Sequence, residues 1–484
     1  MLTADPADWS AAELLAAYAR RAISPVEVAR ACLDRIDRLD PAVNAFCLRD
    51  DDTALALARA SEARWMRGEP AGLVDGVPAT IKDLYLSRGW PTLRGSLTVS
   101  RDQPWEHDHP AVARLREHGA VFLGKTTTPE FGWKGVTDSA LTGITRNPWN
   151  TALTAGGSSG GAGVAAALGM GVLHIGSDGG GSIRMPAAFC GVFGFKPTFG
   201  RVPAWPPSSF GTISHMGPMT RHVEDAALML TVMSESDARA WAALPPEGVD
   251  YRSGLEAGVG GLRVAFSETL GYARVDPEVA ARVRAAVAEL ERLGAEVQAV
   301  DPGEPDPIGI FDRHWFMPAA WTLSKMTPDQ RMLVDPGLQA VAEQGARWGA
   351  FDYLQAMQDR ANYGVAMSLF LDRFDLLVTP TLPIAAFAAG QLVADPATQT
   401  RWTDWTPFTY PFNLTQQPAA SLPVGLTRDG LPVGLQIVAG KHRDALVLRA
   451  ARALEHAFPF RAPPAAATRA RGPARRRPNL DAAP

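Results

Sequence analysis

Residues 154–184 read TAGGSSGGAGVAAALGMGVLHIGSDGGGSIR, so two glycine-serine loops flank an apolar run. The short run from Val172 to Gly176 is typical of a buried β-strand. Three glycines precede Ser182 and leave the backbone N–H groups of this loop unshielded. An oxyanion that forms on a substrate needs such donors within about 3 Å. The loop before Ser182 therefore indicates a site that binds a developing negative charge.

One lysine lies upstream, in the segment VPATIKD at residues 77–83. A lysine can accept a proton only when it is neutral, and burial favours the neutral form by lowering the pKa. Because an apolar run precedes Lys82, we expect its side chain to be buried near two hydroxyl groups. We expect the Asp83 side chain to point elsewhere, since a carboxylate beside the amine would keep it charged.

These residue types suit the hydrolysis of carboxylic amides, which are poor electrophiles with poor leaving groups. In this hypothesis Ser182 attacks the carbonyl carbon, while Ser158, in the first loop, passes the proton of Ser182 to Lys82. The same relay returns a proton to the departing amine, and water then hydrolyses the acyl-enzyme. The scheme uses no metal and no organic cofactor.

Two other motifs indicate different chemistry. Residues 119–126, GAVFLGKT, match the pattern of a phosphate-binding loop. Such a loop follows a strand, whereas a charged helical run precedes Gly119 and residues 120–123 themselves are typical of a buried strand, so we reject nucleotide binding. Residues 157–161, GSSGG, match G-x-S-x-G, which would make Ser159 the nucleophile of an α/β-hydrolase. That chemistry needs a histidine base, and none of the nine histidines stands in a recognisable position for it.

The chain resembles the amidase signature family over about residues 8–460. The resemblance is carried by TAGGSSGGAG from Thr154, SDGGGSIRMPAAFCGVFGFKPTFGRV from Ser177, GVPATIKD from Gly76, and the segments GKTTTPEFG and TRNPWN. It implies Lys82 as the base. It also implies that Ser158 is a bridging serine in a cis peptide and that Ser182 is the nucleophile.

The resemblance further implies an oxyanion hole and a set of supporting residues. The oxyanion hole falls on the amides of Gly179, Gly180, Gly181 and Ser182. The family pattern has a variable residue where this chain has Gly179. The supporting residues are Asp178, Arg184 and Ser159, and for Asp178 with Arg184 we expect a structural salt bridge.

Within the family, the main alternative is the glutaminase component of a tRNA-dependent amidotransferase. Glutamine carries an α-ammonium group, and in that component an aspartate stands shortly before a Thr-x-Pro-x-Asn-Leu run. Here the run is TYPFNL at 409–414 and the corresponding position is Thr406, so we favour a stand-alone amidase. An inactive binding protein on the same fold is a further alternative, which the presence of Lys82, Ser158 and Ser182 disfavours.

Aromatic residues around the same run suggest a pocket for apolar or aromatic substrates, with packing in the core as an equal alternative. We therefore expect a hydrolase of aryl or hydrophobic amides, with esterase activity as a side reaction. The aromatic residues are Trp402, Trp405, Phe408, Tyr410 and Phe412.

Composition and charge limit which binding partners and which cellular location we expect for the protein. The chain has 484 residues, 46% hydrophobic and 20% charged, with a formal net charge of -4. This is typical of a soluble globular protein and lacks the basic surplus of nucleic-acid binding. With no signal peptide and no spanning segment in the sequence, we expect a cytoplasmic enzyme with a small-molecule amide substrate and no nucleic-acid or membrane partner.

Three sparse cysteines suggest neither a disulfide framework nor a zinc site. Family members commonly form homodimers, which makes a homodimer a candidate state.

Periodicity predicts two structured regions, residues 1–70 and residues 71–463. Residues 1–70 form helices packed on the core, two of them starting with a capping box: Ser10 with Glu13 and Ser24 with Glu27. The second helix should stop at Asp40-Pro41. Residues 71–463 form one large α/β domain with a mixed central sheet covered by helices on both faces. The predicted strands are 121–123, 172–176, 262–266, 296–300, 376–379 and 433–438, with helices at 277–293 and 446–458.

Two stretches depart from this rhythm. Residues 301–360 are rich in prolines and aromatic groups and form either a cap over the substrate or helices packed on the core. Residues 464–484 combine few bulky apolar residues with many Pro, Ala and Arg residues. Such a composition buries too little surface to order itself, so a disordered tail is predicted there.

Overall fold

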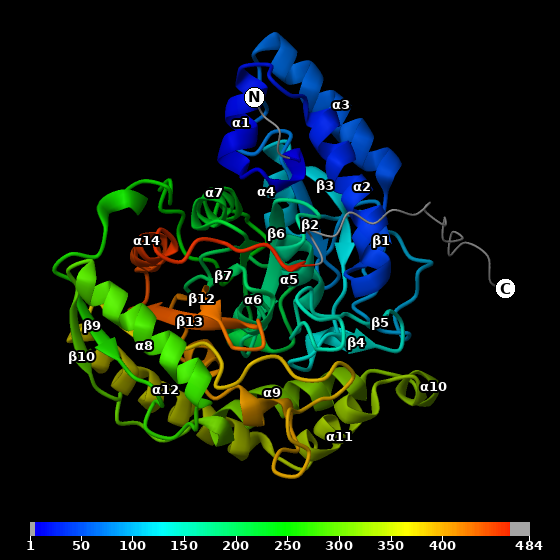
Figure 1. The fold of residues 1–484 in the computed structure, drawn as a ribbon. Coiled ribbons are helices and arrows are strands. Elements are labelled where there is room, and N and C mark those ends of the chain that lie inside the picture. The colour runs from blue at the N-terminus through cyan, green and yellow to red at the C-terminus, as the bar shows by residue number, and fades with distance from the viewer. Residues whose placement is uncertain (1–4, 465–484) are drawn as a thin grey trace.

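A computed structural model describes residues 5–464 and contains one central sheet of eleven strands (Figure 1). The strand order is β1-β3-β2-β6-β8-β7-β12-β13-β11-β9-β10. Strands β3, β2 and β6 run parallel, as do β11, β9 and β10, and the remaining neighbours are antiparallel. The predicted mixed sheet is therefore confirmed. The strands are β1 Phe46–Arg49, β2 Pro78–Lys82, β3 Val121–Thr126, β6 Leu173–Asp178, β7 Phe193–Lys196, β8 His215–Thr220, β9 Arg263–Phe266, β10 Glu296–Ala299, β11 Leu376–Pro380, β12 Ala419–Leu426 and β13 Pro432–Ala439, while β4 Asp138–Ser139 and β5 Gly143–Ile144 form a separate ribbon.

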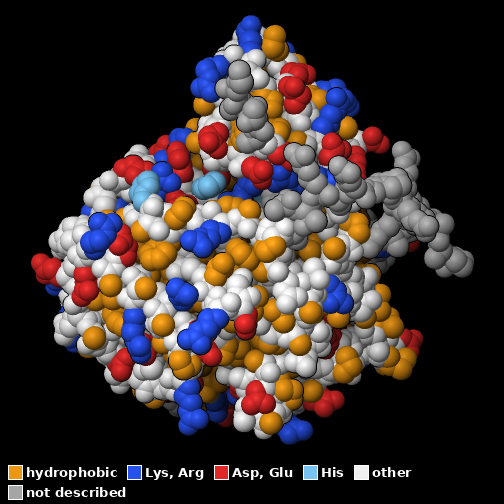
Figure 2. All heavy atoms as spheres, in the orientation of Figure 1, with side chains coloured by type: hydrophobic (Ala, Val, Ile, Leu, Met, Phe, Trp, Pro, Cys, Tyr) orange, Lys and Arg blue, Asp and Glu red, His pale blue; other side chains and the backbone are white. Residues whose placement is uncertain are grey.

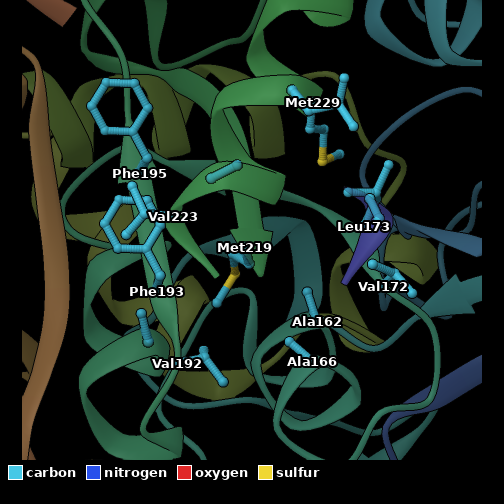
Figure 3. Close-up of a cluster of buried hydrophobic side chains, with 14 of the residues drawn as sticks. Ala162, Ala166, Val172, Leu173, Val192, Phe193, Phe195, Met219, Val223 and Met229 are labelled. Atoms are coloured by element: carbon cyan, nitrogen blue, oxygen red, sulfur yellow. The ribbon is translucent and has the colours of Figure 1, made fainter. Parts of the chain in front are cut away.

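Helices cover both faces of this sheet, and the two faces of β7 show how they pack on it. Its Gly194 faces α6, so closely that a Cβ there would lie 2.7 Å from the Cβ of Ala187. Since successive residues of a strand point to opposite faces, Phe193 and Phe195 face the other side. There they lie beside Val223 of α7 in the core drawn in Figure 3. Helices α5 Gly160–Ala167 and α6 Arg184–Cys190 cover one face, and α7 Val223–Met233, α8 Pro277–Arg292 and α14 Asp444–Glu455 cover the other.

The N-terminal helices begin as predicted, because both capping boxes are present at Ser10 and Ser24. The predicted stop at Asp40-Pro41 is wrong, since α2 continues to Val43. Pro41 removes only one N–H in the last turn, and Asn44 ends the helix in the left-handed conformation with φ of 55°. The same region also supplies the edge strand β1, which was not predicted. These helices are α1 Ala11–Ala19, α2 Pro25–Val43 and α3 Asp51–Arg67.

The segment 301–360 is helical and packs along one end of the sheet, at the bottom of Figure 1. It contains α9 Ile308–Ser324, α10 Pro328–Met332, α11 Pro336–Gly345 and the first half of α12 Ala350–Asp372. The remaining helices are α4 Pro110–Glu117 and the short α13 Pro411–Leu414. The predicted tail, 464–484, lies outside the described residues apart from its first residue.

Three further observations concern residues 5–464. None of their helices is both long and apolar enough to cross a membrane. No three of their His, Cys, Asp and Glu side chains gather in a way that could hold a metal ion. On the face drawn in Figure 2, basic side chains are interspersed with acidic ones.

Candidate active site

Lys82 is the last residue of the buried strand β2, and its side chain is completely buried, as predicted. Its Nζ lies 2.7 Å from Oγ of Ser158, 2.9 Å from Oγ of Ser159 and 2.8 Å from Oγ of Ser177. Burial lowers the pKa of Lys82 well below its ordinary value of 10.5, and the negative charge of Asp178 offsets only part of this effect. The neutral amine is therefore favoured.

The carboxylate of Asp83 turns away from Lys82, also as predicted. It forms an ion pair with Nζ of Lys125 over 2.8 Å, and both side chains are buried. Lys125 belongs to the segment that matched a phosphate-binding loop, and that segment contains the buried strand β3. The rejected nucleotide motif is thus accounted for by a strand and a buried ion pair.

The first serine loop runs from Thr154 to the start of α5 and contains a cis peptide bond between Gly157 and Ser158. Ser159 holds this loop in place, because its N–H donates to the carbonyl of Ser182 over 3.1 Å and its Oγ donates to the carbonyl of Ser177 over 3.1 Å. Ser159 is fully buried and is not among the residues that line the cavity into which Ser158 and Ser182 open, which argues against the G-x-S-x-G nucleophile.

The second serine loop joins β6 to α6 and carries Ser182. The amide of Gly181 donates to Oδ1 of Asp178 over 2.7 Å, so this member of the predicted oxyanion hole is already occupied. The amides of Gly179, Gly180 and Ser182 donate no hydrogen bond to other residues within 5–464. Three of the four predicted donors are therefore free.

Glycines are required in this loop for two reasons. Gly181 has φ of 123°, and a Cβ there would lie 2.4 Å from Oγ1 of Thr409. A Cβ on Gly179 would lie 2.9 Å from the ring of Trp315, a residue of α9. Backbone conformation and close contacts thus both exclude larger side chains.

The predicted salt bridge between Asp178 and Arg184 is present and completely buried. Nε and Nη2 of Arg184 donate to the two carboxylate oxygens over 2.9 Å each. Burial alone would raise the pKa of Asp178, but the guanidinium outweighs it and holds the pKa below its ordinary value. The pair fixes both ends of the turn that carries Ser182.

Ser158, Ser177 and Ser182 open into one cavity of about 560 Å³. Its aromatic lining comes from loops between the strands and from α9. Aromatic lining residues are Tyr85, Phe131, Trp133, Phe199, Phe210, Trp241, Trp315 and Trp321.

For the aromatic residues at 402–412, the structure selects packing in the core from the two alternatives that the sequence left open. All five residues are at most 3% exposed and none of them lines the cavity. Trp402, for example, packs edge-on against Phe311, behind the nucleophile loop. These residues support the wall from behind and do not face a substrate.

Ser177 and Tyr85 were missed by sequence analysis. Nζ of Lys82 donates to Oγ of Ser177 over 2.8 Å, and both Ser177 and Tyr85 line the cavity. The only signal was position, since Ser177 precedes Asp178 at the end of a predicted strand. The fold and the site together define an amide hydrolase that gathers serine hydroxyls around a buried lysine.

Comparison with known proteins agrees with this class. A model of the amidase family matches residues 27–448. An acylamidase of Rhodococcus erythropolis is 39% identical over 93% of this chain and 96% of its own length. The A component of the glutamyl-tRNA(Gln) amidotransferase of Myxococcus xanthus is 36% identical over 94% of this chain and 98% of its own length. The crystal structure of a bacterial aryl acylamidase is 32% identical, with a TM-score of 0.87 over 93% of this chain and 96% of that one. The chain belongs to the amidase signature family and is an amide hydrolase.

Proposed function

We propose that Ser182 is the nucleophile, Ser158 the proton bridge and Lys82 the base of this amide hydrolase. The observation that carries the proposal is the buried Lys82 amine, which contacts three hydroxyl groups and no carboxylate of residues 5–464. Such an amine is neutral and can take the proton that a serine must lose before it attacks. No step needs a metal or an organic cofactor.

Counting hydrogens indicates the direction of each bond to Lys82. The one hydroxyl proton of Ser159 goes to the carbonyl of Ser177, so Ser159 can only accept from Lys82. In this proposal the oxygen of Ser177 accepts the second N–H of Lys82 over 2.8 Å. With both N–H groups of the neutral amine used, its lone pair would face Ser158, whose oxygen lies 2.7 Å away and whose O–H would then donate to it. This is the direction that proton removal requires.

The free amides of Gly179, Gly180 and Ser182 would bind the oxyanion of the tetrahedral intermediate. Preorganised donors of this kind in a closed site are worth about 3–4 kcal/mol each in an acyl-transfer reaction. The proton held on Lys82 then returns through Ser158 to the leaving nitrogen. Water attacks the acyl-enzyme by the same route and frees Ser182.

The substrate class that we propose is an aryl or hydrophobic amide. The aromatic cavity lining supports it, and relatives include an acylamidase and an aryl acylamidase. In this proposal residues 301–360 act as a cap, since Trp315, Trp321 and Leu338 line the cavity. Purified enzyme should hydrolyse anilides faster than glutamine or small aliphatic amides, and the reverse order would contradict this substrate class.

Glutaminase activity is the second candidate function, because the A components of glutamyl-tRNA(Gln) amidotransferases are among the relatives. Thr406, at the position of the aspartate in those proteins, is fully buried, and no Asp or Glu lines the cavity formed by residues 5–464. An α-ammonium group would therefore lack an acidic partner, which favours a stand-alone amidase. Release of ammonia from glutamine at a rate above that for anilides would reverse this preference.

A fluorophosphonate probe tests the catalytic serine directly. We expect it to label Ser182, and we expect the label to vanish in Ser182→Ala while the far-ultraviolet circular dichroism stays unchanged. Ser421→Ala is a matched control, because Ser421 is buried and hydrogen-bonded to Thr381 over 2.9 Å outside the cavity. A folded wild type that takes no label would instead be the inactive binding protein.

Three further features are part of the proposal. We expect a cytoplasmic enzyme without nucleic-acid partners, in which 1–70 pack on a single domain of 71–463. A homodimer is a candidate state, which light scattering after size exclusion would detect as twice the chain mass of 51.7 kDa.

A further inference from the structure

Arg94 lines the same cavity as Ser158 and Ser182. Its guanidinium has no hydrogen bond and no ion pair within the described part of the chain. Although these nitrogen atoms have no partner among residues 5–464, they are not sealed from solvent. A guanidinium has five N–H groups in a planar fork, and here all of them are available to a bound molecule.

The charge around Arg94 is not balanced. The nearest negative group is Asp83, which already pairs with Lys125 over 2.8 Å. Lys125 also donates to the carbonyl of Pro91 over 3.0 Å and to Oγ1 of Thr92 over 2.6 Å, so with Asp83 it has three oxygen partners, which suits an ammonium ion. Two cations therefore share one carboxylate, and the surplus positive charge lies at the cavity wall.

Nothing in the cavity lining compensates this charge. No Asp or Glu is among the lining residues in 5–464. Burial lowers the pKa of His109 to about 3 and that of His215 well below its ordinary value, so both line the cavity as neutral rings. The other lining cation, Lys325, is exposed and lies over the ring of Trp321. Arg94 is the partly buried positive group that a substrate meets at the cavity wall.

The backbone holds Arg94 in a fixed position. Arg94 has φ of 57° and Phe131 has φ of 51°, both in the left-handed region that side chains other than glycine seldom adopt. The carbonyl of Arg94 accepts a hydrogen bond from the N–H of Phe131 over 2.8 Å. Phe131 also lines the cavity, so the backbone at Arg94 is anchored to the wall beside it. Non-glycine residues held in this conformation cluster at ligand-binding sites.

We propose that Arg94 binds a carboxylate of the substrate, so that the amides hydrolysed here are apolar molecules carrying one anionic group. The planar fork of a guanidinium matches a carboxylate with two parallel hydrogen bonds. The substrate's charge would neutralise the surplus left by Asp83 and Lys125. This inference rests on the proposed amide hydrolysis and narrows its substrate class.

Two pairs of anilides test the inference. In one pair the carboxylate is on the acyl chain (succinanilic acid against butyranilide), and in the other it is on the ring (4-acetamidobenzoic acid against 4-methylacetanilide). We expect Arg94→Gln to lower kcat/KM for the acid of at least one pair by about tenfold to a hundredfold, the effect of a charged hydrogen bond. Its neutral partner should change less than about threefold. Comparing each variant with wild type on the same compound cancels differences in intrinsic reactivity.

Controls separate the possible failures. Arg101→Gln removes the same charge from an exposed residue that does not line the cavity, and it should leave all four rates unchanged. Arg94→Lys, which keeps a charge, should retain part of the preference, and it replaces Arg94→Gln if that variant has lost its thermal transition. Equal losses on acids and neutral anilides, or no loss on any acid, would overturn the inference while leaving amide hydrolysis intact. Failure of wild type to cleave any anilide, with no label on Ser182, would instead overturn the proposed function.

Discussion

Ser177→Ala tests whether the hydroxyl cluster tunes Lys82. When Lys82 accepts a proton, its ammonium group has three N–H donors, and the structure provides three hydroxyl oxygens at 2.7, 2.9 and 2.8 Å. Removing Ser177 leaves one charged N–H without an acceptor in a buried site. Ser177 is a positioning residue in this scheme, because it contacts the base and not the reacting carbonyl.

A hydrogen bond to a charged group contributes about 1.5–3 kcal/mol. Losing it in the step that protonates Lys82 should lower kcat by about tenfold to 150-fold. The ammonium form loses more than the neutral amine, so the pKa of Lys82 should fall even further below its ordinary value. Lys82 is active when neutral, so activity rises as pH increases through this pKa. The acid limb of the kcat/KM profile should therefore move to lower pH in the variant.

The assay is the pH dependence of anilide hydrolysis by wild type, Ser177→Ala and Ser177→Thr. The threonine variant keeps a hydroxyl and should recover most of the rate. Ser421→Ala, at a buried serine outside the cavity, should behave as wild type. A rate for Ser177→Ala within threefold of wild type, together with an unmoved acid limb, would refute the reasoning.

Three other predictions concern stability. Gly179→Val should cost about 1–3 kcal/mol by overpacking, since even a Cβ would lie 2.9 Å from Trp315; an unchanged thermal midpoint would contradict the tight contact. Ser24→Ala should lower the free energy of unfolding in urea by about 1 kcal/mol through loss of the α2 cap, whereas Ser24→Asp should have little effect. Burial raises the pKa of Asp225 from 3.8 to about 7. The folded state then keeps a proton that the unfolded state has lost between about pH 4 and 7, so this carboxyl makes stability fall as pH rises through that window. Asp225→Asn should remove that contribution, and identical pH profiles of the melting midpoint would argue against it.

The sequence predicts those parts of the site that lie within a single strand or loop. An apolar run before Lys82 is enough to predict its burial, and glycines before Ser182 predict exposed amides. Pairings across the fold left no such trace, because the partner of Gly179 is a ring on α9 and the partner of Phe131 is the carbonyl of Arg94. Those contacts form only when the chain has folded.

The aromatic residues around Trp402 show a second limit. Their composition fits a pocket and a core equally well, and tertiary packing decides which side of the wall they occupy. The helix through Pro41 shows a third, because a proline costs little where only one hydrogen bond of the last turn is lost. In each case local chemistry permits two outcomes and long-range packing selects one.

The contact between Gly179 and Trp315 links two positions far apart in the sequence into one steric unit. Bulk can be moved from one member to the other, but it cannot be added to both. An evolving lineage that acquires a side chain at 179 must therefore shrink the ring on α9, in the same generation or an earlier one. Historical changes in the size of molecule accepted should appear as paired exchanges at these two sites.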